Sequence, residues 1–380
     1  MPSAQNGSGI SRRSQRFEDK VRRPKISAEI AKAGSALSGT AQTEFLEVLD
    51  ATSGKFRNLL FDAALIQRTN LENTDLNSDP IWQDVPSLRV GFIAGEVSNA
   101  TSPDAASPAI KVGSCVLVLG NNEPDRKPVG IDFDLHPVHE LYESAAGVDE
   151  DHSEHAAKLI ETARIACEMA GILSLLKKQP PLDVIVLHDS LVNPVSPLAS
   201  VRPGDAGAFP NFAAASLPGL LADMDCAHTG KSTNFIPVYL EQLNRMAKSN
   251  KTVCGLVEQV ASRAPGVLTK ALLQRLVDES VIDLAFQRQF LDSMFQYGIG
   301  DTILFECVLD EGEFAEPVKA DLQDEGRIPG NWDPEIQSFP KPLITYAKAH
   351  ADMMPVRIES FPGMQLNSHQ LTRLIIKVCR

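Results

Sequence analysis

The chain has 380 residues, of which 43% are hydrophobic and 22% charged, and its formal net charge at pH 7 is -13. These totals predict a soluble globular protein with a sizeable core, and the acidic balance excludes a nucleic-acid-binding surface that covers the whole chain. No apolar run reaches the roughly 18 residues that a membrane helix needs. We therefore expect a cytoplasmic protein that does not enter a membrane.

The first 25 residues are small, polar and basic, with seven Lys and Arg against two acidic residues. This composition predicts a disordered, solvated arm, and the alternative is that the arm contacts phosphate. From residue 26 apolar residues recur at helical spacing as far as Ala63. They predict one or two amphipathic helices ahead of the first strand. We assign residues 26–380 to one domain.

Six cysteines are present, and none of them forms a C-x-x-C pair, which excludes zinc-ribbon and thioredoxin-type motifs. Several lie in apolar runs, as Cys115 does in the segment 114–118, where cysteine behaves as a small buried hydrophobe. This usage is typical of a reducing cytoplasm.

Two strands are predicted first, at Arg89–Glu96 and Ile110–Leu119, and they resemble the opening hairpin of a mixed sheet. The acidic segment 132–155 follows and carries two His-x-x-His pairs, which begin at His136 and His152. Paired histidines at this spacing can bind a metal on a helix. Pro137 and the surrounding acidic residues favour a solvated loop instead.

A helix is predicted from Glu154 to Lys178, and it leads into the apolar run Leu182–Leu187. Glu168 stands in an apolar part of this helix, so it lies either on the solvent side or beside a partner. The apolar run reads as a buried central strand and ends in His188-Asp189-Ser190. Because ligands gather at strand tips of open α/β sheets, Asp189 is the first candidate for chemistry. A turn-capping role is the alternative.

Residues 191–233 are rich in Pro, Ala, Gly and Ser and predict an insertion or a flexible lid. The alternation of elements predicts an α/β fold. A helix is also predicted at 235–248, more than one helix within 268–297, and a last helix at 369–378. The remaining predicted strands are at 252–257, 302–309, 343–346 and 355–359.

Several motifs follow one another between about residues 85 and 365: Ile93-Ala94-Gly95-Glu96-Val97-Ser98, Glu168 on its helix, Leu187-His188-Asp189-Ser190-Leu191, Val253-Cys254-Gly255-Leu256-Val257-Glu258, Gly300-Asp301-Thr302, Ile344-Thr345-Tyr346 and Arg357-Ile358-Glu359-Ser360-Phe361-Pro362. In this order they resemble the NurA family of nucleases. Members of that family have an RNase H-like core and partner the hexameric HerA helicase/translocase in DNA end processing. Their two strand motifs read Asp-Gly-Ser, and a later strand reads Val-x-Gly-Val-x-Lys.

This chain departs from that pattern at three places. A direct overlay puts Ala94 at the first Asp, and only a shift of two residues brings Glu96 there. Either His188 or Asp189 occupies the second Asp position. Glu258 replaces the Lys of the later strand.

The resemblance implies an RNase H-like mixed sheet flanked by helices, with N-terminal helices and an insertion. It also implies a DNA nuclease that depends on Mn or Mg, acts in end processing and repair, forms a homodimer and partners a HerA-like ATPase. Its catalytic and metal-binding residues would be Glu96, Glu168 and Asp189, with His350 or Asp352 as a fourth ligand, because hard cations prefer carboxylate oxygens.

Two other interpretations remain open. The missing Asp, the change from Lys to Glu258 and the acidic body suit a catalytically degenerate NurA-like structural or regulatory subunit of such an assembly. Alternatively the resemblance extends to the fold alone and Asp189 is a turn residue. In every case we expect the Arg357-Ile358-Glu359 segment to form a buried ion pair or a sheet-edge feature.

Overall fold

The computed structural model describes residues 17, 20, 39–69, 88–99, 108–118, 130–137, 153–194, 235–249, 251–258, 265–323, 325–328 and 338–379. Most of the predicted 191–233 insertion therefore lies outside the described residues, as do His139 and His152. No helix in the described part of the chain is long and apolar enough to cross a membrane.

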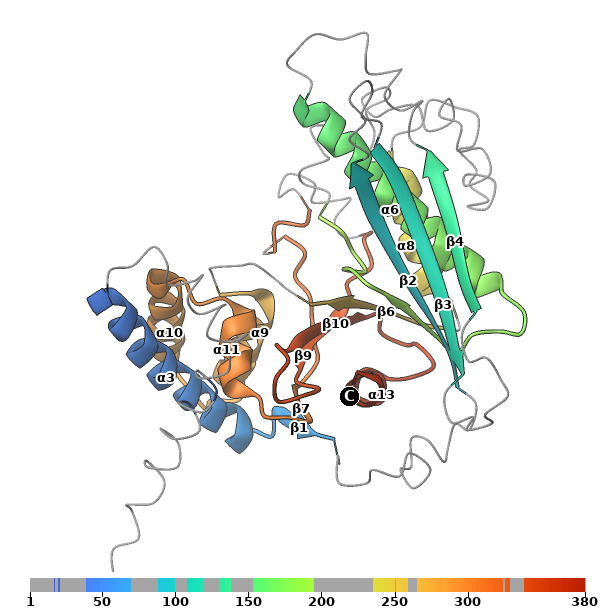
Figure 1. Ribbon diagram of the computed structural model, residues 1–380. Helices are drawn as coiled ribbons and strands as arrows, with labels where there is room; N and C mark the ends of the chain where they lie inside the picture. The colour runs from blue at the N-terminus through green and yellow to red at the C-terminus, as the bar shows by residue number, and fades with distance from the viewer. Residues whose placement is uncertain are drawn as a thin grey trace, which may run out of the picture.

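A ten-stranded mixed sheet forms the centre of the protein (Figure 1). Its order is β1-β7-β9-β10-β6-β5-β2-β3-β4, and β8 pairs with β9. The strands are β1 (Ile66–Arg68), β2 (Arg89–Asn99), β3 (Pro108–Val118), β4 (Gly130–Pro137), β5 (Val184–Leu187), β6 (Thr252–Val257), β7 (Glu313–Ala315), β8 (Val318–Lys319), β9 (Leu343–Ala347) and β10 (Val356–Ser360).

Within this sheet β2, β3 and β4 form an antiparallel meander, β5 lies parallel to β2, and β6 lies parallel to β5. Counted from β2, the strand order is 3-2-1-4-5, which is the order of an RNase H-like core. The remaining strands join β6 through β10, which is antiparallel to it. The predicted mixed α/β sheet flanked by helices is confirmed.

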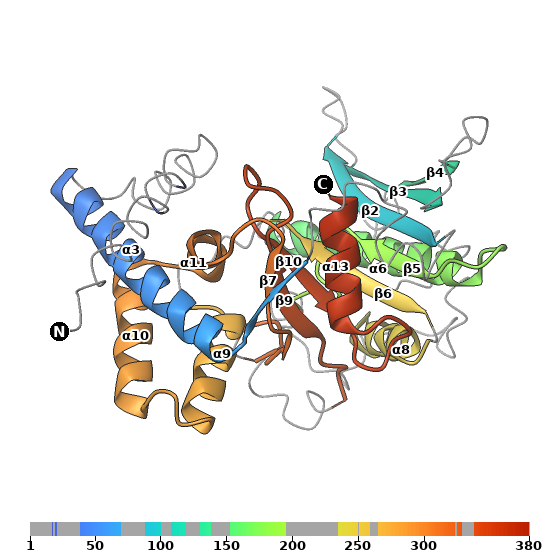
Figure 2. The same cartoon turned by 90° about the horizontal axis from the view of Figure 1, so that it is seen from below.

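Helices cover both faces of the sheet (Figures 1 and 2). Helices α6 and α8 pack on one face and α13 packs on the other, while α3, α9, α10 and α11 form a helical lobe beside β7 and β9. The helices are α3 (Gly39–Asp62), α6 (Ser153–Lys177), α8 (Phe235–Ala247), α9 (Val267–Asp278), α10 (Leu284–Tyr297), α11 (Asp301–Val308) and α13 (Ser368–Val378).

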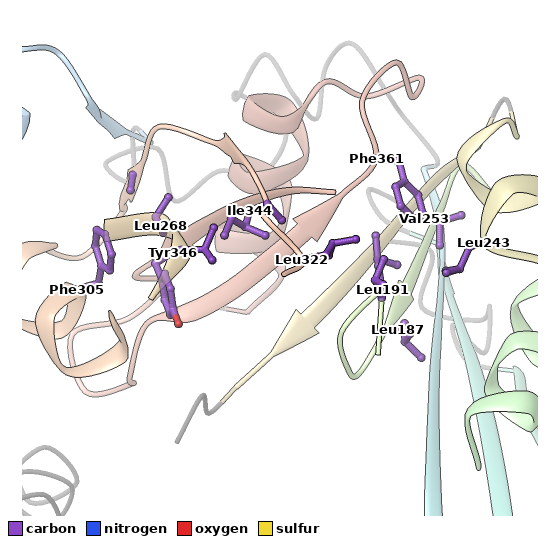
Figure 3. Close-up of a cluster of buried hydrophobic side chains, with 14 of the residues drawn as sticks. Leu187, Leu191, Leu243, Val253, Leu268, Phe305, Leu322, Ile344, Tyr346 and Phe361 are labelled. Carbon is purple, nitrogen blue, oxygen red and sulfur yellow. The ribbon is translucent and has the colours of Figure 1, made fainter. Parts of the chain in front are cut away.

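Strand β5 is the central strand that the sequence predicts, and all four of its residues are buried. Ile185 and Leu187 belong to the core on the α6 face, whereas Val184 and Val186 belong to the core under α13. A strand buried on both faces needs apolar residues at every position, which explains the unbroken run. Figure 3 shows Leu187 close to Leu191 at one end of the α6-side core, and Phe305 beside Tyr346 at the other.

The strand predicted at 302–309 is wrong, because these residues form helix α11. Gly300 is extended at the N-cap position, and seven of the eight helical residues are buried. A helix that is buried all round lacks the polar face that would reveal its period, so a short apolar run cannot be told from a strand. Phe305 stacks on Tyr346 with ring centroids 5.1 Å apart.

The prediction of a solvated loop over 132–155 is wrong at its start, because residues 132–137 belong to strand β4. The sequence Ile131-Asp132-Phe133-Asp134-Leu135-His136 alternates apolar and polar residues, which is the period of a strand with one solvated face. The strand was not predicted because Pro137 and the acidic residues are also typical of a loop. Strands β1, β7 and β8 were also not predicted, and each has only two or three residues.

Two residues of the predicted basic arm lie against the folded body. Phe17 packs against the larger of the two hydrophobic cores, which extends from α6 into the helical lobe. Lys20 is buried, with 4% of the residue exposed. Its ammonium donates hydrogen bonds to the carbonyls of Glu306 at 2.9 Å and Cys307 at 3.4 Å, and it lies 3.3 Å from the Asp310 carboxylate. The last carbonyls of a helix have no partner within it, so Lys20 satisfies the end of α11.

Candidate active site

Arg164 joins the two carboxylates that the sequence singles out on α6 and after β5. Its Nη1 lies 2.7 Å from Glu168 Oε1 and its Nη2 lies 2.8 Å from Asp189 Oδ2. Arg164 and Glu168 are one helical turn apart, so both side chains project from the same side of α6. A single guanidinium therefore bridges a helix and the tip of the central strand.

Glu168 is the buried member of this cluster, with 1% of the residue exposed. Oε1 also accepts a hydrogen bond from the Gly95 N–H at 3.0 Å, and Oε2 has no hydrogen-bond partner among the described residues. Burial raises the pKa of Glu168 to about 7, against the attraction of Arg164, and the nearby Asp189 adds to the rise. A carboxylate in this position binds a proton far more readily than an exposed one.

The alternation of strand β2 decides which of its residues faces the cluster. Ile93 packs against α6, where a Cβ added to Gly171 would lie 2.2 Å from Ile93 Cδ1. Two residues on, a Cβ added to Gly95 would lie 2.6 Å from Glu168 Oε1. Because successive side chains point to opposite faces, Ala94 and Glu96 point away from α6 and from Glu168. Both are exposed.

The turn that carries Asp189 crosses over β6 at Gly255. A Cβ at Gly255 would lie 2.4 Å from the Asp189 carbonyl oxygen, so only glycine allows this approach. Asp189 Oδ1 accepts a hydrogen bond from the Ser190 N–H at 2.7 Å, and 29% of its side chain is exposed. The turn therefore presents Asp189 Oδ2 to Arg164 on the α6 face.

The other predicted residues lie elsewhere. His188 points to the opposite side of the strand tip and pairs with Glu258, with Nε2 and Oε1 3.3 Å apart and both side chains exposed. Asp352 lies between β9 and β10, has a side chain 75% exposed, and its backbone N–H donates to His350 Nδ1 at 3.2 Å. No group of three or more His, Cys, Asp or Glu in the described part of the chain is arranged to hold a metal ion.

The structure thus brings together Glu168 and Asp189 but not Glu96 or Asp352. Two further residues of the site were not predicted from the sequence. One is Arg164, whose only signal was its i,i+4 spacing to Glu168. The other is Gly95, which is the β2 residue that faces Glu168. The two carboxylates already share a cation, so as they stand they do not fit a centre for divalent cations.

Comparison with known proteins gives distant matches to solved structures. No family model matches the chain, and no curated protein matches its sequence. The crystal structure of the NurA nuclease from Sulfolobus solfataricus has 11% identity and a TM-score of 0.42, over 83% of this chain and 84% of that one. A second NurA crystal structure has 9% identity and a TM-score of 0.37, over 90% of each chain. A NurA structure with manganese has 9% identity and a TM-score of 0.35, over 87% of this chain and 90% of that one.

Proposed function

We propose that this chain is a NurA-like subunit of a DNA-end-processing assembly and that it does not itself cleave DNA. The observation that carries the proposal is Gly95. It is the β2 residue that faces Glu168, and it adds no carboxylate to the Glu168–Asp189 pair. Nucleases that use divalent cations cluster carboxylates around the cations, and loss of one carboxylate removes a ligand.

The partners in this proposal are DNA, a HerA-like hexameric ATPase and a second copy of the chain. The motifs between about residues 85 and 365 follow the NurA order, and this resemblance supports a HerA-like ATPase as the partner. The acidic balance of the whole chain, with a net charge of -13, suits a subunit whose partner supplies most of the phosphate contacts. Because such assemblies process DNA ends, the proposal includes a role in DNA repair.

A metal-dependent deoxyribonuclease is the second candidate, and one observation favours it. Glu168 Oε2 is buried and without a hydrogen-bond partner among the described residues, and Asp189 is partly open to solvent. These oxygens suit Mn or Mg. This candidate needs Arg164 to leave the pair and β2 to turn Glu96 toward α6, with Asp352 as a further ligand.

Cleavage of labelled linear single- and double-stranded DNA with Mn²⁺ or Mg²⁺ separates the two candidates. The assay compares the wild type, Asp189→Ala and the matched control Glu241→Ala, whose carboxylate pairs with Arg245 on the surface of α8. We expect no cleavage by any of them and co-purification of the wild type with a HerA-type ATPase. Cleavage that needs the cation, survives Glu241→Ala and disappears in Asp189→Ala would establish the nuclease instead.

A further inference from the structure

The Arg164 guanidinium stands between two carboxylates, at the place where a cation would bind both. Nη1 contacts Glu168 and Nη2 contacts Asp189, so each carboxylate receives a separate N–H group of the same fork. Arginine binds carboxylates in this way because its donors are planar and fixed. The single positive charge of Arg164 thus pairs with two carboxylates, one on α6 and one after β5.

Burial distinguishes this cluster from an ordinary surface ion pair. The Arg164 and Glu168 side chains are 13% and 1% exposed. Arg245 and Glu241 have the same i,i+4 spacing and the same kind of contact at 2.8 Å, but their side chains are 38% and 31% exposed. Water can replace Arg245 as the partner of Glu241, whereas a charged Glu168 depends on a counter-ion within the protein.

Glu168 also has an oxygen that Arg164 does not satisfy. Oε2 is buried, and no described residue donates a hydrogen bond to it. The cluster therefore holds more oxygen ligands than its guanidinium uses. Hard divalent cations take such oxygens, often two from one carboxylate.

From these observations we infer that Arg164 is a built-in counter-ion, which excludes divalent cations from the Glu168–Asp189 pair, and that its removal opens a divalent-cation site there. The inference deepens the proposed function, because it names what replaces a metal at this face. It concerns binding alone and involves neither DNA nor cleavage.

The test measures Mn²⁺ binding by calorimetry and the rise in Tm with Mn²⁺, on the full chain without DNA. We expect Arg164→Met to bind one Mn²⁺ and to gain Tm as Mn²⁺ is added. The wild type and the matched control Arg245→Met should do neither. Adding Asp189→Asn to Arg164→Met should abolish the binding, since it removes one of the two carboxylates.

Two results would overturn the inference. In the first, the wild type binds Mn²⁺ and Asp189→Asn abolishes that binding, so that Arg164 excludes nothing. In the second, folded Arg164→Met shows no Mn²⁺ response that depends on Asp189. If Arg164→Met folds only when Mn²⁺ is present, the inference stands.

The double variant Arg164→Met/Glu168→Gln covers the case in which Arg164→Met stays unfolded in Mn²⁺ as well. A folded double variant would show that a counter-ion is needed but that a divalent cation cannot supply it. An unfolded one would show that Arg164 acts through packing. Either result overturns the inference. The proposed function fails separately, when cleavage by the wild type is found or the HerA-type ATPase does not bind.

Discussion

The Glu359 carboxylate accepts a hydrogen bond of 3.0 Å from the backbone N–H of Leu191, two residues after Asp189. Arg327 pairs with the same carboxylate and donates to the Val192 carbonyl at 2.8 Å. Arg357 completes the group, 2.8 Å from Glu359. The buried ion pair expected for the Arg357-Ile358-Glu359 segment is present, and it fixes the turn that presents Asp189.

We expect Glu359→Ala to lower the free energy of unfolding by about 3–5 kcal/mol. The reason is that Arg327 and Arg357 stay buried and then share one remaining carboxylate, that of Glu325. Urea unfolding measures the loss. The control Glu279→Ala removes an exposed i,i+4 pair with Arg275 and should change stability by no more than about 0.5 kcal/mol. Equal losses in the two variants would contradict the structural role of Glu359.

Glu325 should make stability depend on pH. Burial raises its pKa to about 7, against the attraction of Arg327, and Glu359 adds to the rise. Between the ordinary value of 4.5 and 7 the folded chain keeps a proton that the unfolded chain releases. Stability therefore falls as pH rises through this window, by at most about 1.4 kcal/mol per pH unit. Below pH 4.5 both states are protonated and the cost is absent.

Glu325→Gln should remove the fall in stability that Glu325 causes. The free energy of unfolding of the variant, relative to that of the wild type, should therefore increase as pH rises from 4.5 to 7. Urea unfolding at several pH values measures both proteins. Glu279→Gln, at the exposed pair with Arg275, is the control and should follow the wild-type profile. A constant gap between Glu325→Gln and the wild type across the window would refute the prediction.

Gly255→Ala should cost about 1–3 kcal/mol, because its Cβ would lie 2.4 Å from the Asp189 carbonyl oxygen and 2.8 Å from the Leu191 nitrogen. Both are backbone atoms, so the turn must move. Faster exchange of the Leu191 amide should accompany the loss. Gly326→Ala, where only a φ of +66° opposes the change, should leave that amide unaffected.

Asp301→Ala should destabilise the protein by about 1–3 kcal/mol through the start of α9. Asp301 is 4% exposed and accepts hydrogen bonds from the Gly266 N–H at 2.8 Å and the Thr269 hydroxyl at 2.6 Å. Gly266 has no side chain to cap the helix, so Asp301 does this from α11. Unfolding of Asp283→Ala, which removes the exposed cap of α10, provides the comparison and should cost about 1 kcal/mol.

Much of the fold could be predicted where residues carry their own local pattern. Strand β5 is apolar throughout, and the final helix, predicted at 369–378, is α13 (Ser368–Val378). Helix α11 was mistaken for a strand because burial on every side removes the polar face that reveals a period. The short strands at the β1 edge form through pairing with distant partners, which no local pattern records.

The candidate site was harder to predict, because its composition depends on which way each side chain faces. Glu168 and Asp189 were found from their unusual surroundings in sequence. The sequence offered Ala94 or Glu96 as the β2 residue of the site, and neither is correct. Because Ile93 packs on α6, the β2 residue that faces Glu168 is Gly95. Arg164 looks like a solvated helix residue until Asp189, 25 positions later, is placed beside it.

The contact of Lys20 with the end of α11 has a practical consequence for handling this chain. Residues ahead of the first long helix look dispensable by composition, and a shortened version that starts at α3 is a natural choice for expression. Such a version would lose the ammonium that satisfies the carbonyls of Glu306 and Cys307. Affinity tags are therefore better added ahead of Met1 than used to replace the first twenty-five residues.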